Sequence, residues 1–430
     1  MNTIKFKLIV MNFLQFAVWG SYLTSMGGYL FAAGYGELIG WFYAMQGIVS
    51  MFMPAIMGII ADKWIPAQRL LGLCHGIAAL FIAGAGYCGE QNMLWPMFTL
   101  YSISVAFYMP TLALSNSVAY TVLEQGGYDT VKAFPPIRVF GTVGFIVAML
   151  VCDFAGFQSN PVQFFQCAAI GVILAIYAQM LPKCPVSRTD EAKSFAQRLG
   201  LDAFTLFRSK QMALFFIFSM LLGVSLQITN GFANGFITSF KANPEFANTF
   251  GANHANALIS LSQVSETLCI LLIPFCLKRF GIKRVMLIAM FAWVLRFGLF
   301  GLGNPGPGLW MFILSMIVYG VAFDFFNISG SLYVNENTSG DMRSSAQGLF
   351  MIMTNGIGAT VGTLGAQAVV NHLVPAEVKV GDAVTNGMEV AQGWSHTWLA
   401  FAGYALVVAL LFWVLFKYKH DTSKQVEINH

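Results

Sequence analysis

The chain has 430 residues, of which 57% are hydrophobic and only 10% are charged, with a formal net charge of +4. An ordinary soluble domain carries about 25% charged residues, so this composition excludes a water-soluble fold. The small positive balance indicates no nucleic-acid partner.

Long uncharged runs follow one another along the chain. A hydrophobic run of about 18 or more residues with few charges predicts a membrane-spanning helix. The runs are 8–36, 38–61, 70–89, 91–123, 139–182, 211–240, 246–277, 285–335, 344–376 and 390–416. Runs 139–182 and 285–335 each have room for two spans. The sequence therefore predicts an all-α membrane protein with twelve transmembrane helices in two six-helix bundles.

In chain order, residues 1–182 are the predicted N-terminal bundle, 183–210 a charged cytoplasmic linker, 211–418 the C-terminal bundle and 419–430 a cytoplasmic tail. Residues 190–207 of the linker can form an interfacial helix, with apolar residues on one side and charges elsewhere.

Two short basic connections, 58–69 and 274–284, stand six spans apart and indicate that the halves are related by a repeat. The connection 373–393 is long and polar, and is expected on the external side.

The positions of lysine and arginine predict the orientation. Cytoplasmic connections of membrane proteins carry an excess of these residues. Of the 23 lysines and arginines, Arg138 and Arg296 fall at a span start and inside a span, and only Lys241 and Lys379 lie in external connections. Both termini are therefore expected in the cytoplasm.

The sequence predicts no metal or cofactor. Its seven cysteines are scattered without a CxxC pair, and its six histidines have no metal-ligand spacing. There is no Walker A stretch either, so a pump of this kind would take its energy from an ion gradient or from the gradient of its substrate.

Charged residues inside predicted spans mark candidate sites. An ionisable residue at the centre of a membrane helix is costly and is usually paired or functional. The four are Asp153, Glu266, Arg296 and Asp324. Glu266 lies near the middle of its run, whereas Asp153 lies near the external end and is expected to snorkel to the interface.

Residues three or four apart share one helix face, and polar and aromatic residues recur at that spacing on five spans. Span by span they are Gln15, Trp19 and Tyr22; Arg138, Thr142 and Phe145; Gln227, Asn230 and Asn234; Gln263 and Glu266; and Tyr319, Phe323 and Asn327. A further span offers Gln347, Thr354 and Asn355. Taken singly, such residues often only bridge helices. Together, amides, a carboxylate and aromatic faces suit a neutral, planar, hydroxylated ligand.

Several long stretches resemble the bacterial nucleoside:proton symporters, the NupG type of the major facilitator superfamily. Among them are FLQFAVWGSYLTSMGGY (13–29), FPPIRVFGTVGF (134–145), LQITN (226–230), SQVSETL (262–268), SMIVYGVAFDFFNISGS (315–331) and SAQGLFMIMTNG (345–356). The resemblance runs from about residue 5 to 420. It implies two helical bundles that work by alternating access.

The resemblance also implies a nucleoside site. Its residues are Arg138, Thr142, Phe145, Gln227, Asn230, Gln263, Glu266, Tyr319 and Phe323. Asp324 resembles a functionally sensitive family position, so Glu266, Asp324 and Arg138 are the candidates for proton coupling.

We therefore expect a monomeric transporter, and no enzyme, in the lipid bilayer of a bacterial inner membrane, importing nucleosides such as uridine or adenosine with protons. Desolvation disfavours the charged form of Glu266, so this residue could load a proton outside and release it inside. The alternatives are a symporter for a sugar or another polar metabolite, and a uniporter. A membrane-embedded enzyme or receptor would need a catalytic dyad, a metal motif or a signalling domain, none of which occurs in the sequence.

Overall fold

The structure is a computed structural model that describes residues 3–186, 201–338, 343–380 and 383–418. The chain divides into two compact units. Unit 1 comprises Met1–Gly36 and Phe42–Leu199, and unit 2 comprises Glu37–Trp41 and Gly200–His430.

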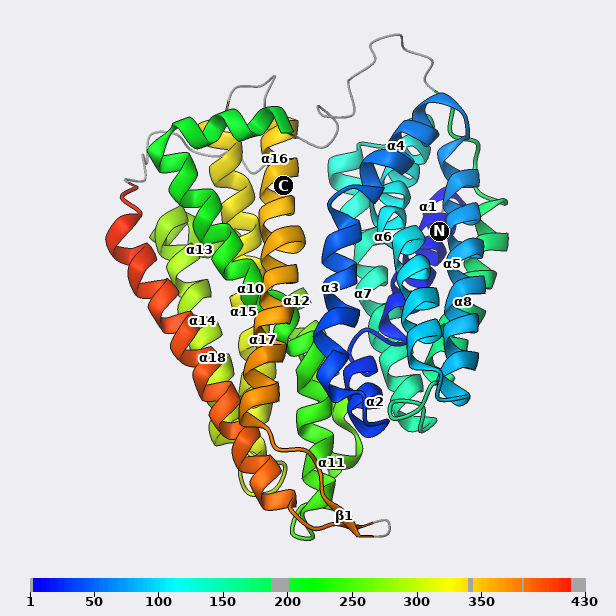
Figure 1. The fold of residues 1–430 in the computed structure, drawn as a ribbon. Helices are drawn as coiled ribbons and strands as arrows, with labels where there is room; N and C mark the ends of the chain where they lie inside the picture. Colours follow the sequence, from blue (N-terminus) through cyan, green and yellow to red (C-terminus); the bar gives the residue numbers. More distant parts are fainter. Residues whose placement is uncertain (1–2, 187–200, 339–342, 381–382, 419–430) are drawn as a thin grey trace. The chain divides into compact units, whose positions relative to one another are not determined.

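The first half of the chain is helical throughout its described part (Figure 1). Its elements are α1 (Thr3–Gly20), α2 (Met26–Ala32), the 3-10 helix η1 (Gly36–Leu38), α3 (Ile39–Ser50), α4 (Met53–Lys63), α5 (Ala67–Glu90), α6 (Leu94–Gln125), α7 (Thr130–Phe154) and α8 (Val162–Ala178).

The second half is also mainly helical. Its elements are the 3-10 helix η2 (Leu201–Arg208), α10 (Lys210–Ser239), η3 (Phe240–Ala242), α11 (Phe250–Asn253), α12 (Ala255–Ile270), α13 (Ile273–Phe280), α14 (Ile282–Leu302), α15 (Leu309–Asn337), α16 (Arg343–Met351), the π-helix η4 (Ile352–Gly358), α17 (Ala359–Leu373), β1 (Lys379–Val380), β2 (Ala383–Val384) and α18 (Gly387–Leu415).

The described helices account for the expected spans. Eight are long and apolar enough to cross a membrane, and two bent pairs raise the number to ten. The remaining two expected spans correspond to α8, with 17 residues, and to α1 followed by α2. The prediction of an all-α membrane fold with about twelve spans is confirmed.

Both bent pairs break at a proline. Helices α3 and α4 meet at 41°, with Pro54 in the first turn of α4, and α12 and α13 meet at 56°, with Pro274 in the first turn of α13. Proline has no backbone N–H and clashes with the preceding turn, so the first turn of a new helix accommodates it well. The two breaks lie in predicted spans two and eight, which agrees with the repeat seen in the sequence.

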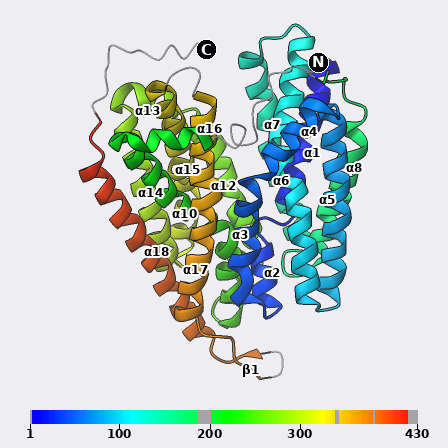
Figure 2. The same ribbon diagram turned by 45° about the horizontal axis from the view of Figure 1, so that its top comes forward.

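Within unit 1, α1 lies along α7, and α5 lies between α6 and α8 (Figures 1 and 2). Helices α1 and α7 approach closely at two glycines. A Cβ atom on Gly144 would lie 2.8 Å from the carbonyl carbon of Phe13, and one on Gly20 would lie 2.9 Å from the Cα of Phe145. Only glycine permits this contact between backbones.

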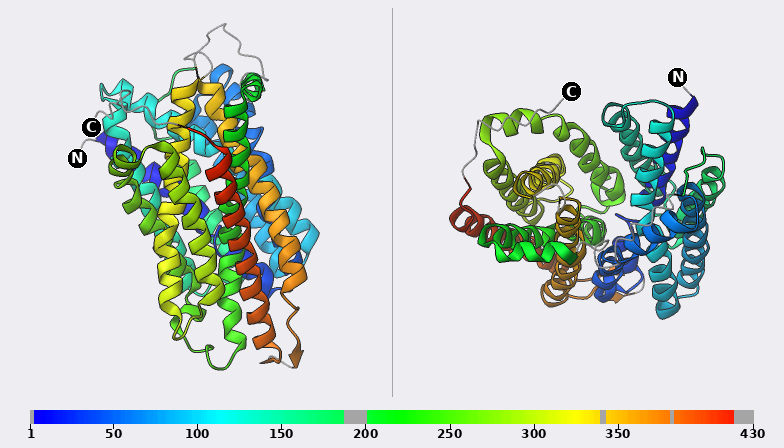
Figure 3. Two further views of the ribbon diagram at one scale, coloured as in Figure 1. Left: turned by 90° about the vertical axis from the view of Figure 1, so that its left-hand side faces the viewer. Right: turned by 90° about the horizontal axis from the view of Figure 1, so that it is seen from above.

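Within unit 2, α15 packs against α12 and α14, while α10 packs against η4, α17 and α18 (Figure 3). This arrangement brings the polar stripes of α12 and α15 onto neighbouring helices.

Two predicted segments differ from a purely α-helical picture. The connection 373–393 contains a two-residue antiparallel ladder that pairs Lys379 with Val384. Most of the predicted interfacial helix, 190–207, lies outside the described residues; its described end, Leu201–Arg208, is a 3-10 helix rather than an α-helix. The tail 419–430 also lies outside them.

Candidate substrate site

Helix α7 presents three site candidates of unit 1 on successive turns. Phe145 is buried, and its ring meets that of Trp19 edge to face at 6.4 Å. Arg138 and Thr142 are half-buried. The Arg138 guanidinium carbon lies 3.8 Å from the ring centroid of Phe16, a cation–π distance. The α1–α7 contact thus fixes both a cation and an aromatic ring.

A buried polar network supports this stripe. His75 Nε2 lies 2.7 Å from Gln15 Oε1, Gln15 Nε2 donates to Thr111 Oγ1 at 2.7 Å, and the Tyr108 hydroxyl donates to the Gln15 carbonyl at 3.0 Å. The Tyr108 ring then packs against Trp19 at 5.9 Å. Through Tyr108, the network therefore fixes the Trp19 ring, which in turn contacts Phe145.

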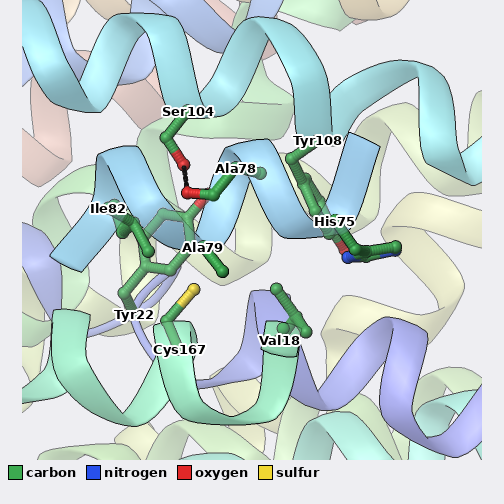
Figure 4. A pocket seen from close by; sticks show the side chains of 10 residues that line it. Val18, Tyr22, His75, Ala78, Ala79, Ile82, Ser104, Tyr108 and Cys167 are labelled. Atoms are coloured by element: carbon green, nitrogen blue, oxygen red, sulfur yellow. Dashed lines mark hydrogen bonds between the residues drawn. The ribbon is translucent and has the colours of Figure 1, made fainter. Parts of the chain in front are cut away.

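Figure 4 shows a small cavity beside this network, lined by His75 and Tyr108 among other residues. His75 lies beside Tyr108, and Ser104 donates to the Ala78 carbonyl at 2.7 Å. The cavity that they line with Tyr22 has a volume of about 10 Å³, room for no more than one water molecule. This cavity is therefore too small for a nucleoside, and its lining residues serve to hold the α7 side chains in place.

Sequence reasoning missed His75. It sits singly in an apolar run and counts as neutral, so neither charge nor periodicity marked it. Only the contact with Gln15, sixty residues away in sequence, reveals the network.

In unit 2, α10 supplies two side-chain amides that are hydrogen-bonded to each other. Asn230 Nδ2 donates to Gln227 Oε1 at 2.8 Å, and both side chains are half-buried. Asn234, which the spacing placed on the same stripe, is fully buried and donates to Asn256 of α12 at 3.0 Å. Asn234 therefore joins two helices, whereas Gln227 and Asn230 keep an accessible edge.

Helix α12 is anchored by serines on one side and carries the acid on the other. The Ser262 hydroxyl donates to Met316 Sδ at 3.1 Å, and Ser265 donates to the Ile317 carbonyl. Gln263 and Glu266 are half-buried. The serine contacts with α15 fix the rotation of α12 and hence the direction of its amide and acid.

Helix α15 carries the aromatic pair. The rings of Tyr319 and Phe323 stack at 5.6 Å with an interplanar angle of 10°. Tyr319 is buried and Phe323 half-buried. Next to them, Asp324 is only 5% exposed, and its helix α15 packs against α12, which carries Glu266. Within the described part of the chain, Asp324 Oδ2 has no hydrogen-bond partner.

The other two charged residues of the spans, Asp153 and Arg296, are both buried but have different partners. The prediction that Asp153 snorkels is wrong: it is 3% exposed and accepts a hydrogen bond from Gln158 Nε2 at 3.2 Å. The nearby turn folds back over it and supplies the amide that replaces water. Arg296 is fully buried against Tyr319, at 4.6 Å from the ring centroid.

The comparisons with known proteins assign the family. The sequence model of the family described as nucleoside H⁺ symporter matches residues 1–421. The chain belongs to this family. The xanthosine permease of Escherichia coli is 47% identical over 98% of both chains, and the nucleoside permease NupG of Escherichia coli is 46% identical over 97% of both.

Solved structures agree with the family assignment. A crystal structure of the nucleoside transporter NupG matches with a TM-score of 0.87 at 45% identity, covering 97% of this chain and 100% of that one. A peptide transporter structure matches at 11% identity, with a TM-score of 0.68 and coverage of 96% of this chain and 94% of that one. This second likeness shows the fold alone.

As a nucleoside H⁺ symporter, the chain is a multi-pass membrane transporter that imports nucleosides with protons by alternating access, and it is not an enzyme. The alternatives of a sugar symporter and of a uniporter are therefore set aside.

Proposed function

We propose that nine residues bind the nucleoside. They are Arg138, Thr142, Phe145, Gln227, Asn230, Gln263, Glu266, Tyr319 and Phe323. Two observations support the set: its polar members outside α7 are half-buried amides and an acid, and its aromatic members are held by ring contacts.

The aromatic residues receive the base. Phe323 is stacked on Tyr319 and is itself half-buried, so it presents a flat surface of fixed orientation. Aromatic stacking contributes about 0.5–1.5 kcal/mol beyond the apolar area that it buries, and it tolerates different bases because each has a flat face.

The amides and the acid receive the ribose. The Asn230–Gln227 bond uses one donor of Asn230 and one acceptor of Gln227. Each amide keeps further hydrogen-bonding capacity for a hydroxyl group. Glu266 and Gln263, one turn apart on α12, add acceptors and donors. Uridine and adenosine both offer the required hydroxyl groups, so we expect both to be substrates.

The coupling proton is carried by the acid pair of Glu266 and Asp324. Two carboxylates on helices that pack against each other, α12 and α15, repel when both are ionised in a membrane interior. The buried Asp324 Oδ2 has no hydrogen-bond partner in the described chain to compensate a charge. One proton shared by the pair removes this repulsion, and Arg138 remains the third candidate for proton coupling.

We further propose a monomer in the bacterial inner membrane with both termini in the cytoplasm; the lysine and arginine distribution supports this orientation. Fusion of a reporter that is fluorescent only in the cytoplasm to the C-terminus tests the orientation, because a non-fluorescent but membrane-inserted fusion would contradict it.

The function is tested with the purified full chain in proteoliposomes. Uptake of labelled uridine, adenosine and xanthosine is followed with and without a pH gradient, acid outside. A gradient of one pH unit stores about 1.36 kcal/mol per mole of protons. Coupling of one proton to one nucleoside should therefore give about tenfold accumulation for each pH unit of the gradient. Uptake that only equilibrates would contradict proton coupling.

A further inference from the structure

Arg296 is a buried cation that the proposed transport mechanism does not use. It lies in the second half of α14 and is 1% exposed. A guanidinium in a membrane span is costly unless its charge is compensated. Hydrogen-bond acceptors on neighbouring helices compensate the charge of Arg296.

These groups belong to the two helices that carry the acid and the aromatic pair. Arg296 Nη1 donates to the Ser315 carbonyl of α15 at 2.6 Å and lies 3.5 Å from Ser262 Oγ of α12. The Ser315 hydroxyl donates back to the Arg296 carbonyl at 3.0 Å. Arg296 therefore links α14 to α15 and α12 at the residue directly before Gln263.

The guanidinium also covers a ring of the aromatic pair. Its carbon lies 4.6 Å from the Tyr319 centroid and 5.2 Å from the Phe300 centroid. Both are cation–π distances, which matter most in a desolvated setting. Tyr319 in turn stacks on Phe323. The orientation of the Phe323 ring, which is proposed to receive the base, thus depends on a cation in the neighbouring helix α14.

We infer that Arg296 is a positioning residue for nucleoside binding: it fixes the Tyr319–Phe323 pair relative to the Gln263–Glu266 face. This inference rests on the proposed site. Unit 1 shows a similar arrangement, in which His75 on α5 packs against Tyr108 on α6, with ring centroids 5.8 Å apart. In both units a buried side chain with ring or guanidinium nitrogens lies beside a tyrosine of the following span.

The test uses the full chain in proteoliposomes and measures KM and Vmax for uridine uptake. Arg296→Met keeps the apolar stem and removes the cation, and Arg284→Met at the exposed start of α14 is the matched control. We expect Arg296→Met to raise KM about tenfold, within the range of one desolvated cation–π contact. Vmax per folded transporter should change little, and Arg284→Met should match the wild type.

A double-mutant cycle separates positioning from general stability. If Arg296 acts through Tyr319, Arg296→Met should raise KM no further in a Tyr319→Leu background, because the ring that it positions is already absent. Additive effects would overturn the inference. Should Arg296→Met fail to fold, Arg296→Lys serves instead: it keeps the charge, loses the planar group, and should raise KM several-fold with an unchanged Vmax.

The outcomes distinguish the inference from the proposed site. If Tyr319→Leu leaves KM unchanged, the proposed site is wrong. If Tyr319→Leu raises KM while Arg296→Met and Arg296→Lys do not, only the positioning role of Arg296 is refuted.

Discussion

The close contact between α1 and α7 predicts that Gly144→Ala destabilises the protein and weakens substrate binding. The added methyl group would lie 2.8 Å from the Phe13 carbonyl carbon and 2.9 Å from the Phe13 Cα, against 3.4 Å for ordinary contact. The Phe13 carbonyl oxygen lies closer still, and all three atoms belong to the α1 backbone, so α1 must move by at least about 0.6 Å. That movement separates Trp19 from Phe145.

The expected loss of stability in Gly144→Ala is worked out by comparison with a matched control substitution. Gly76→Ala in α5 places its methyl group 3.8 Å from the nearest atom, the Ala175 Cβ, so it makes an ordinary contact. Both substitutions replace glycine by alanine within a helix, and the gain of about 1 kcal/mol in helix propensity cancels between them. What remains is the cost of overpacking, about 1–3 kcal/mol.

The measurement is thermal unfolding of the two purified variants in the same detergent, together with KM for uridine uptake. We expect Gly144→Ala to melt below both the wild type and Gly76→Ala, and its KM to rise. Equal melting temperatures for Gly144→Ala and Gly76→Ala would refute the argument that this backbone contact sets the position of the α7 stripe.

Three further predictions concern single contacts. Asn230→Ala removes the partner of Gln227 and should raise KM for uridine about five- to thirty-fold in uptake assays, the equivalent of about 1–2 kcal/mol for a lost hydrogen-bonding group; an unchanged KM would remove Asn230 from the site. Phe323→Leu keeps apolar volume and loses the stack, so KM should rise about two- to twelve-fold, and by a similar factor for uridine and adenosine. His75→Ala leaves the buried Gln15 Oε1 without its 2.7 Å partner and should lower the unfolding free energy by about 1–3 kcal/mol; a wild-type melting temperature would contradict this.

The sequence could predict which helix faces carry polar groups, because helical spacing depends on local geometry alone. Gln227 and Asn230 are three apart and are bonded to each other in the structure, and Tyr319 and Phe323 are four apart and stacked. Span number and type also followed from the length of the apolar runs. These are properties of one segment at a time.

The sequence could not predict which polar residues serve another helix. Asn234 has the same spacing as Asn230, yet it is buried against Asn256. Asp153 is near the end of its span, which predicted contact with water, but Gln158 in the following turn donates a hydrogen bond to it. The role of Arg296 depends on Ser315 and Tyr319, which belong to a different span. Each of these outcomes depends on which helices become neighbours.

The central claim is that a carboxyl group within the bilayer couples nucleoside movement to protons. It is tested most directly by comparing wild type and Glu266→Gln in proteoliposomes, with accumulation of labelled uridine under an imposed pH gradient measured beside exchange of labelled for unlabelled uridine at equal pH. Glutamine keeps hydrogen-bonding capacity but carries no proton. We predict that Glu266→Gln loses accumulation and retains part of the exchange, whereas a variant that still concentrates uridine against its gradient would show that Glu266 is not the coupling acid.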